Sequence, residues 1–102
     1  FILTEYGADA ISGIHSAVPN MFSEEFQAEY YSTVNSVLDR YAFVAGEHAW
    51  NFADFQTVQG AMRADGNKKG VFTRDRRPKL AAHYFRQRWR SIPDFDYKKI
   101  ND

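Results

Sequence analysis

One glutamate stands at the end of the first apolar run of the chain, Glu5 in the segment Thr4-Glu5-Tyr6-Gly7. A carboxylate at the C-terminal end of a buried parallel strand can project into an active site and act as a nucleophile. The same position also suits a structural ion pair at a strand end. Glu5 is therefore a candidate nucleophile, with ion pairing as the alternative.

A second glutamate, Glu47, follows the other apolar run and could in principle be the catalytic partner of Glu5. Glu47 and Trp50 are an odd number of residues apart, so an extended strand that turns Trp50 inward turns Glu47 outward. Two catalytic carboxyl groups must face each other across the substrate, so we favour a structural ion pair for Glu47. Trp50 can offer a flat apolar platform to a sugar ring, and core packing is its alternative.

A later loop with two glycines carries a possible binding site for a carboxylate. Asn67 and Lys69 are two residues apart and point the same way if the backbone is extended, which places an amide and an ammonium side by side. Gly66 and Gly70 would permit close turns, and Arg63 could add a planar charged fork. The alternative is a solvated basic turn, the commoner outcome for an Asn-Lys-Lys sequence.

The composition argues against several other classes of function. Thirteen basic and thirteen acidic residues give a net charge of +0, so we expect no nucleic-acid partner and no membrane partner. The chain has no cysteine, and its three histidines show no metal-ligand spacing, so we expect no metal. No apolar run approaches the roughly 20 residues that span a bilayer. The compartment stays open.

Two short apolar segments, Phe1–Thr4 and Ala42–Gly46, are typical of parallel strands. A helix with Ser23 as N-cap is expected between them, and a second helix from Pro78 to Pro93. The inner face predicted for the first helix comprises Phe22, Phe26, Tyr30, Val34, Val37, Leu38 and Tyr41. The face predicted for the second comprises Leu80, Ala81, Tyr84, Phe85, Trp89 and Ile92.

The order strand, helix, strand, helix predicts an α/β fold with parallel strands. Long connections follow each strand, at residues 6–21 and 51–77, which is the asymmetry of a (β/α)8 barrel. Two strands are too few to cover two aromatic-rich helices, so we interpret the chain as part of a longer protein. The intact mass of the source protein should then greatly exceed 11.8 kDa.

Several segments agree in order and spacing with one known family. They are Leu3–Asp9, Met21–Glu25, Gly46–Phe55 and Gly66–Arg74. Together they closely resemble the β-glucuronidases of glycoside hydrolase family 2, and the likeness extends to about Trp89. The resemblance implies that residues 1–102 are the C-terminal segment of a TIM-barrel catalytic domain, its last two strand-helix units, with the rest of the enzyme outside this chain.

The resemblance also implies roles for the residues singled out above. Glu5 would attack the anomeric carbon and form a covalent glycosyl-enzyme intermediate. Asn67 and Lys69 would grip the glucuronate carboxylate, Arg63 matches an arginine near the same carboxylate, and Trp50 matches a tryptophan of the site. A retaining glycosidase also needs a second carboxyl group about 5 Å away, which the family carries in an Asn-Glu-Pro segment absent here.

The resemblance further implies β-D-glucuronide substrates, the remainder of the same enzyme as partner, no cofactor, and a homo-oligomer, a tetramer in family relatives. By analogy with related barrels, we expect a cis peptide bond after Trp50. The isolated fragment should be inactive. Two alternatives stay open: a relative acting on another uronide such as a β-galacturonide, and a non-catalytic carbohydrate-binding fragment built around Trp50.

Overall fold

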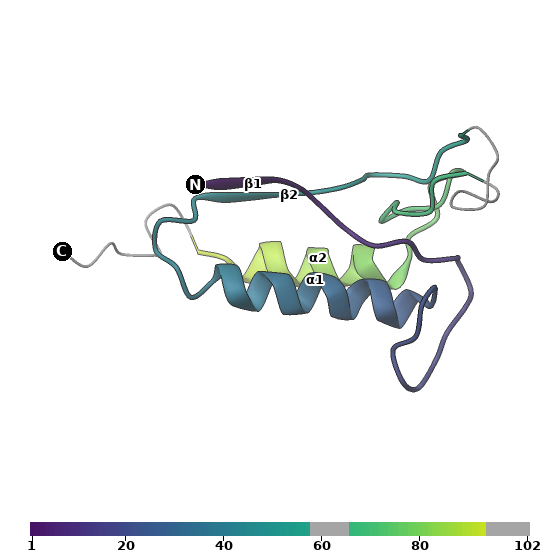
Figure 1. The fold of residues 1–102 in the computed structure, drawn as a ribbon, viewed down its shortest axis with the longest axis horizontal. Helices are drawn as coiled ribbons and strands as arrows, with labels where there is room; N and C mark the ends of the chain where they lie inside the picture. Colours follow the sequence, from purple (N-terminus) through teal and green to yellow (C-terminus); the bar gives the residue numbers. More distant parts are fainter. Residues whose placement is uncertain (58–65, 94–102) are drawn as a thin grey trace.

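The computed structural model describes residues 1–57 and 66–93. Its elements follow the order β1 (Ile2–Tyr6), α1 (Glu24–Leu38), β2 (Gly46–Ala49) and α2 (Leu80–Ser91). The strands pair in parallel, and both helices lie on one side of the pair, so the predicted α/β order is confirmed (Figure 1). Within these residues no helix is long and apolar enough to cross a membrane.

The long connections gather where both strands end, at the right of Figure 1, and the helices run back from there. A small core between strands and helices comprises Tyr6, Tyr31, Val71, Ala81 and Phe85. The aromatic rings of this core meet edge to face, and the ring centroids of Tyr31 and Phe85 are 4.6 Å apart. This core fixes the strand ends relative to the helix starts.

The helix α1 begins as predicted but is rotated relative to the predicted inner face. The Ser23 hydroxyl accepts the N–H of Phe26 at 3.1 Å, which confirms the N-cap. The predicted face is wrong at Phe22, Val37 and Tyr41, which are exposed. The buried positions of α1 are Glu24, Gln27, Tyr31 and Asn35. Hydrophobicity alone missed this face because its polar members have partners inside the fold.

The helix α2 begins at Leu80, two residues after the predicted start. The side chain of the N-cap residue Lys79 makes no capping hydrogen bond. Instead, the carboxylate of the buried Glu24 in α1 accepts the Leu80 N–H at 2.6 Å. Phe85 is buried as predicted, whereas Leu80 and Trp89 are exposed, contrary to prediction. A backbone N–H at the start of α2 thus finds its hydrogen-bond acceptor in a residue 56 positions earlier in the chain.

The second strand lies later than predicted. The segment expected as a strand, Ala42–Gly46, is mostly a turn in which the Val44 N–H donates to the Tyr41 carbonyl at 3.2 Å. Val44 is buried there without being in a strand. An apolar run identifies a buried segment but does not distinguish a strand from a packed turn.

The pairing of β1 with β2 contains one irregularity. Leu3 lies opposite Glu47 and Tyr6 opposite Ala49, so β1 takes three steps where β2 takes two. Leu3 packs against the core and Tyr6 belongs to it, whereas Glu5 between them is exposed. In a regular strand Glu5 would share the face of Leu3. The bulge therefore turns Glu5 away from the helices, an effect that bulges often have beside active sites.

Candidate active site

The strand ends bring Glu5 and Trp50 to one edge of the sheet. The Trp50 N–H donates to the Tyr6 carbonyl at 2.8 Å, so Trp50 is bonded to the residue after Glu5. Ala49 packs against the core, and the next side chain, that of Trp50, is 42% exposed. Since Ala49 faces the core, the next side chain, Trp50, leaves the backbone on the opposite side, the side to which the bulge turns Glu5.

The Glu5 carboxylate has no partner among residues 1–57 and 66–93. The ion pair considered as an alternative for Glu5 therefore does not occur within this part of the chain. The peptide bond after Trp50 is cis, as expected. The Trp50 carbonyl accepts the hydroxyl of Tyr31 at 3.1 Å, which ties this residue to α1.

The loop with Asn67 and Lys69 runs beside the residue that follows Trp50. The Asn51 N–H donates to the Lys69 carbonyl at 3.1 Å. Asn67 is buried, and its side-chain oxygen accepts the Lys69 N–H at 2.8 Å. The Lys69 ammonium has no partner within the described residues. Arg63 lies outside the described residues.

The two glycines of this loop occupy positions where a side chain would not fit. Gly66 has a φ of +93°, in the left-handed region. A Cβ on Gly70 would come within 2.2 Å of the Asp54 nitrogen and 2.4 Å of the Phe72 oxygen. The close turn predicted at Gly66 is confirmed, whereas Gly70 allows close backbone packing and the turn predicted there stays a prediction.

A buried ion pair beneath the loop was not predicted. Lys79 and Asp54 are both buried, and the Lys79 Nζ lies 2.9 Å from the Asp54 Oδ1. Burial lowers the pKa of Lys79, and Asp54 opposes this. These residues are 25 positions apart in chain segments without periodic pattern, so spacing could not reveal the pair.

Glu47 faces the helices and forms the predicted ion pair. Its carboxylate accepts hydrogen bonds from Arg88 at 2.7 and 2.9 Å and from the Tyr6 hydroxyl at 3.2 Å. Burial acts to raise the pKa of Glu47, but the hydrogen bonds from Arg88 outweigh it and hold this pKa below its usual range. Arg88 also forms two 2.9 Å bonds with Asp39. Glu47 is therefore engaged in structure.

Replacing Arg88 by methionine is expected to lower the free energy of unfolding by about 2 kcal/mol at neutral pH. This loss is smaller than the loss of a fully buried ion pair would be, because Asp39 is exposed. The pKa of Glu47 is lower in the folded than in the unfolded protein. The ion pair therefore contributes its full stabilisation above the unfolded pKa of about 4.3, and this contribution is lost as the pH falls through the pKa of the folded state. Thermal midpoints of wild type and Arg88→Met should therefore converge at acidic pH. Arg90→Met, an exposed change in the same helix, should leave the midpoint nearly unchanged. A pH-independent difference would contradict this account.

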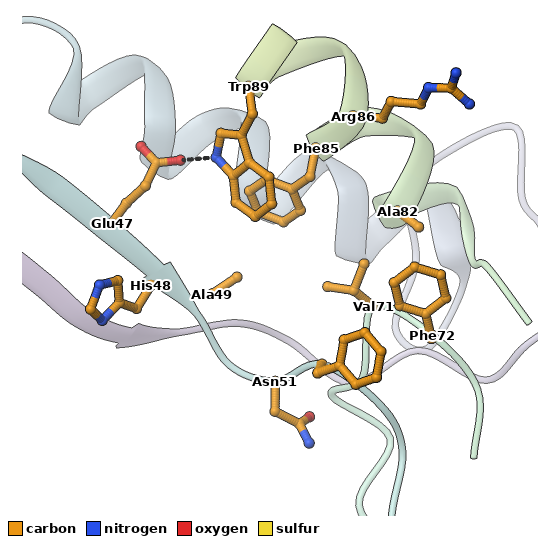
Figure 2. A pocket seen from close by; sticks show the side chains of 11 residues that line it. Glu47, His48, Ala49, Asn51, Val71, Phe72, Ala82, Phe85, Arg86 and Trp89 are labelled. Carbon is orange, nitrogen blue, oxygen red and sulfur yellow. Dashed lines mark hydrogen bonds between the residues drawn. The ribbon is translucent and has the colours of Figure 1, made fainter. Parts of the chain in front are cut away.

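A pocket of about 470 Å³ lies between the end of β2 and α2 (Figure 2). Its walls are mainly apolar, with Phe72, Phe85 and Trp89 among them, and the Trp89 indole donates to Glu47 at 3.3 Å. Among the described residues, Glu5, Trp50, Asn67 and Lys69 do not line it. This pocket is on the helix side of the strands, and Glu47, the carboxylate among its described lining residues, is paired with Arg88.

Chemically, the edge formed by the strand ends combines a carboxylate without a partner in residues 1–57 and 66–93, an exposed aromatic ring and a loop with an amide and an ammonium. Such a set can hold a sugar ring, bind an anionic substituent and attack an electrophilic carbon. No group of three histidine, aspartate or glutamate residues that could hold a metal ion occurs within residues 1–57 and 66–93.

Comparisons with known proteins relate nearly the whole chain to one family. A family model for the TIM barrel domain of glycosyl hydrolases family 2 matches residues 1–93. The β-glucuronidase of Paenibacillus borealis is 55% identical over 97 residues, which are 95% of this chain and 16% of that protein. The mouse β-glucuronidase is 55% identical over 92 residues, 87% of this chain and 14% of that protein.

Solved structures agree with this relation. The β-glucuronidase of Bifidobacterium dentium in complex with coumarin-3-O-glucuronide has a TM-score of 0.91 and 56% identity, and the match covers 95% of this chain and 16% of that one. The chain spans about one sixth of the length of the Paenibacillus and Bifidobacterium relatives.

Proposed function

The chain belongs to glycosyl hydrolases family 2, as a C-terminal part of the TIM barrel domain, and we propose that the complete enzyme hydrolyses β-D-glucuronides. The relatives that cover nearly all of the chain are β-glucuronidases. The Bifidobacterium dentium relative was solved with coumarin-3-O-glucuronide, an aryl glucuronide, and is 56% identical to this chain. We extend that substrate class to this protein.

In this proposal Glu5 is the nucleophile of a retaining mechanism. Its carboxylate attacks the anomeric carbon, the bond to the aglycone breaks, and a glucuronyl ester forms on Glu5. Water then attacks the same carbon and releases glucuronic acid, which restores the carboxylate. The bulge in β1 and the absence of a partner for Glu5 among the described residues support this role. The observation that carries the proposal is a carboxylate at the strand end, near Trp50, that has no partner in the part of the chain the structure describes.

Asn67 and Lys69 bind the carboxylate of the glucuronide in this proposal, and Trp50 contacts the sugar. The Asn51–Lys69 backbone bond links the loop to the residue after Trp50, which supports a shared site. The Lys69 ammonium, which has no partner in residues 1–57 and 66–93, is suited to an anionic substituent. Arg63, outside the described residues, is proposed as an additional cation near the same carboxylate.

The remainder of the enzyme supplies the second carboxyl group, which protonates the leaving oxygen and later deprotonates water. This chain is proposed to form the last two strand-helix units of the barrel. Both helices cover one side of β1 and β2, as in a barrel whose helices form the outer ring (Figure 1). The mechanism needs carboxyl groups and water, and no cofactor.

Substrate discrimination tests the proposal in the complete enzyme. The 4-nitrophenyl β-D-glucuronide should be cleaved with a kcat/KM at least about 10²-fold above that of the matching β-D-glucoside, since the neutral sugar leaves Lys69 without a charged partner. The β-D-galacturonide, which keeps the carboxylate but differs at one hydroxyl, is the informative comparison. Preference for the galacturonide would favour the other uronide class, and equal cleavage of glucuronide and glucoside would contradict the proposal.

A further inference from the structure

The ammonium of Lys79 joins three separate segments of the chain. It lies 2.7 Å from the carbonyl of Ala10, 2.9 Å from the Asp54 Oδ1 and 3.1 Å from the carbonyl of Lys68. An ammonium has three donors, so these contacts use all of them. The Lys79 side chain is fully buried, which makes each bond costly to lose. Lys79 thereby fastens Ala10, in the connection after β1, and Asp54, early in the connection after β2, to the segment around Lys69.

The pair of Asp54 and Lys79 holds the two peptide groups on either side of Lys69. Lys79 donates to the Lys68 carbonyl, which belongs to the peptide before Lys69. The Gly70 N–H, which belongs to the peptide after it, donates to the Asp54 Oδ1 at 2.9 Å. Fixing both peptide planes fixes the backbone dihedral angles of Lys69 and the direction in which its side chain leaves the backbone.

Asn67 is coupled to the same peptide. The N–H of Lys69 belongs to the peptide whose carbonyl Lys79 holds, and this N–H donates to the Asn67 side-chain oxygen at 2.8 Å. Rotation of that peptide would break both bonds. The orientation of the Asn67 amide therefore depends on Lys79 as well.

We propose that Asp54 and Lys79 are positioning residues that set the direction of the Asn67 and Lys69 side chains toward the substrate carboxylate. This inference rests on the proposed function of those two residues. Asp54 and Lys79 do not touch the substrate. They fix the backbone conformation of the loop. Their loss should therefore lower the ratio of kcat/KM for anionic substrates to kcat/KM for neutral substrates.

The test compares kcat/KM for 4-nitrophenyl β-D-glucuronide and β-D-glucoside in the complete enzyme. Lys79→Met should lower the glucuronide value by about 10²-fold, the scale of a displacement of about 1 Å at a binding group, and change the glucoside value little. Asp54→Asn keeps an acceptor for the Gly70 N–H and should reduce the glucuronide preference by about tenfold. Asp75→Asn, the same change at an exposed position, is the matched control and should leave the preference unchanged.

A purely structural role would lower both activities in parallel with the amount of folded enzyme, and a parallel loss in the variants would overturn the inference. If Lys79→Met does not fold, Asp54→Asn decides, with its thermal midpoint confirming that it is folded at the assay temperature. Failure of the proposed function is recognised separately, because wild type would then lack a preference for the glucuronide. A wild type with that preference, combined with unchanged preference in folded Asp54→Asn, would refute only the positioning role.

Discussion

Replacement of Glu5 by glutamine in the complete enzyme is expected to lower kcat on an aryl β-D-glucuronide by about 10⁴-fold or more, the scale lost when a covalent nucleophile is removed. The amide keeps the size of the side chain but is a poor nucleophile at the anomeric carbon, so the glycosyl-enzyme ester cannot form. Binding should change little, because Glu5 contributes to the reaction more than to recognition. Steady-state kinetics with a direct measurement of ligand binding would distinguish the two effects.

Glu47→Gln is the matched control, since it makes the same chemical change at the glutamate of the neighbouring strand β2. Its carboxylate is engaged by Arg88 and Tyr6, so this variant should lose thermal stability and retain kcat within about tenfold of wild type. Near-normal turnover in Glu5→Gln, or an equally deep loss in folded Glu47→Gln, would remove Glu5 from the role of nucleophile.

Glu5→Ala with added azide provides a second test of the same role. A small external anion can occupy the space of the missing carboxylate and attack the anomeric carbon from the same side. The expected product is α-glucuronyl azide, because a single displacement inverts the configuration. The product is identified by NMR, and rescue that gives only free glucuronic acid would argue against Glu5 as the attacking group.

Replacement of Lys69 by alanine is expected to lower kcat/KM for the glucuronide by about 10²-fold and to change that for the glucoside by less than threefold. The physical reason is the loss of a charge-assisted hydrogen bond, about 1.5 to 3 kcal/mol, which only an anionic substrate makes. The ratio of the two kcat/KM values measures the effect and is insensitive to the amount of active enzyme.

The neighbouring lysine supplies the control for this prediction. Lys68→Ala removes an ammonium group from the adjacent position of the same loop and should keep the preference for the glucuronide. Equal losses on both substrates in Lys69→Ala, or an equal loss of preference in Lys68→Ala, would contradict the assignment of Lys69 to the substrate carboxylate.

Local signals in the sequence predicted several features that the structure confirms. Ser23 caps α1, and the parity of Glu47 and Trp50 correctly indicated that Glu47 turns toward the helices. These features depend on neighbouring residues, whose geometry is set by the periods of helix and strand. The predicted roles of Glu5, Asn67 and Lys69 stay predictions, and they rest on motif resemblance together with the arrangement of the strand ends.

Features that join distant segments could not be predicted from the sequence. The inner face predicted for α1 was wrong because Gln27 and Asn35 are buried there, where they form hydrogen bonds with residues far along the chain. Hydrophobic periodicity detects apolar burial and overlooks polar residues that find partners only after folding. The second strand was misplaced for a related reason, since pairing with β1, and not the apolar run at residues 42–46, decides where the strand lies.

The sequence by itself determined the order of strands and helices, the family and the residue types available to a carboxylate-binding glycosidase site. Only the tertiary structure decided which way those residues face. Glu5 is turned from the helices by a register shift against a strand some 40 residues later, and Lys69 is directed by Asp54 and Lys79, 25 positions apart. Register and buried ion pairing are properties of segments that meet in space, so no local pattern encodes them.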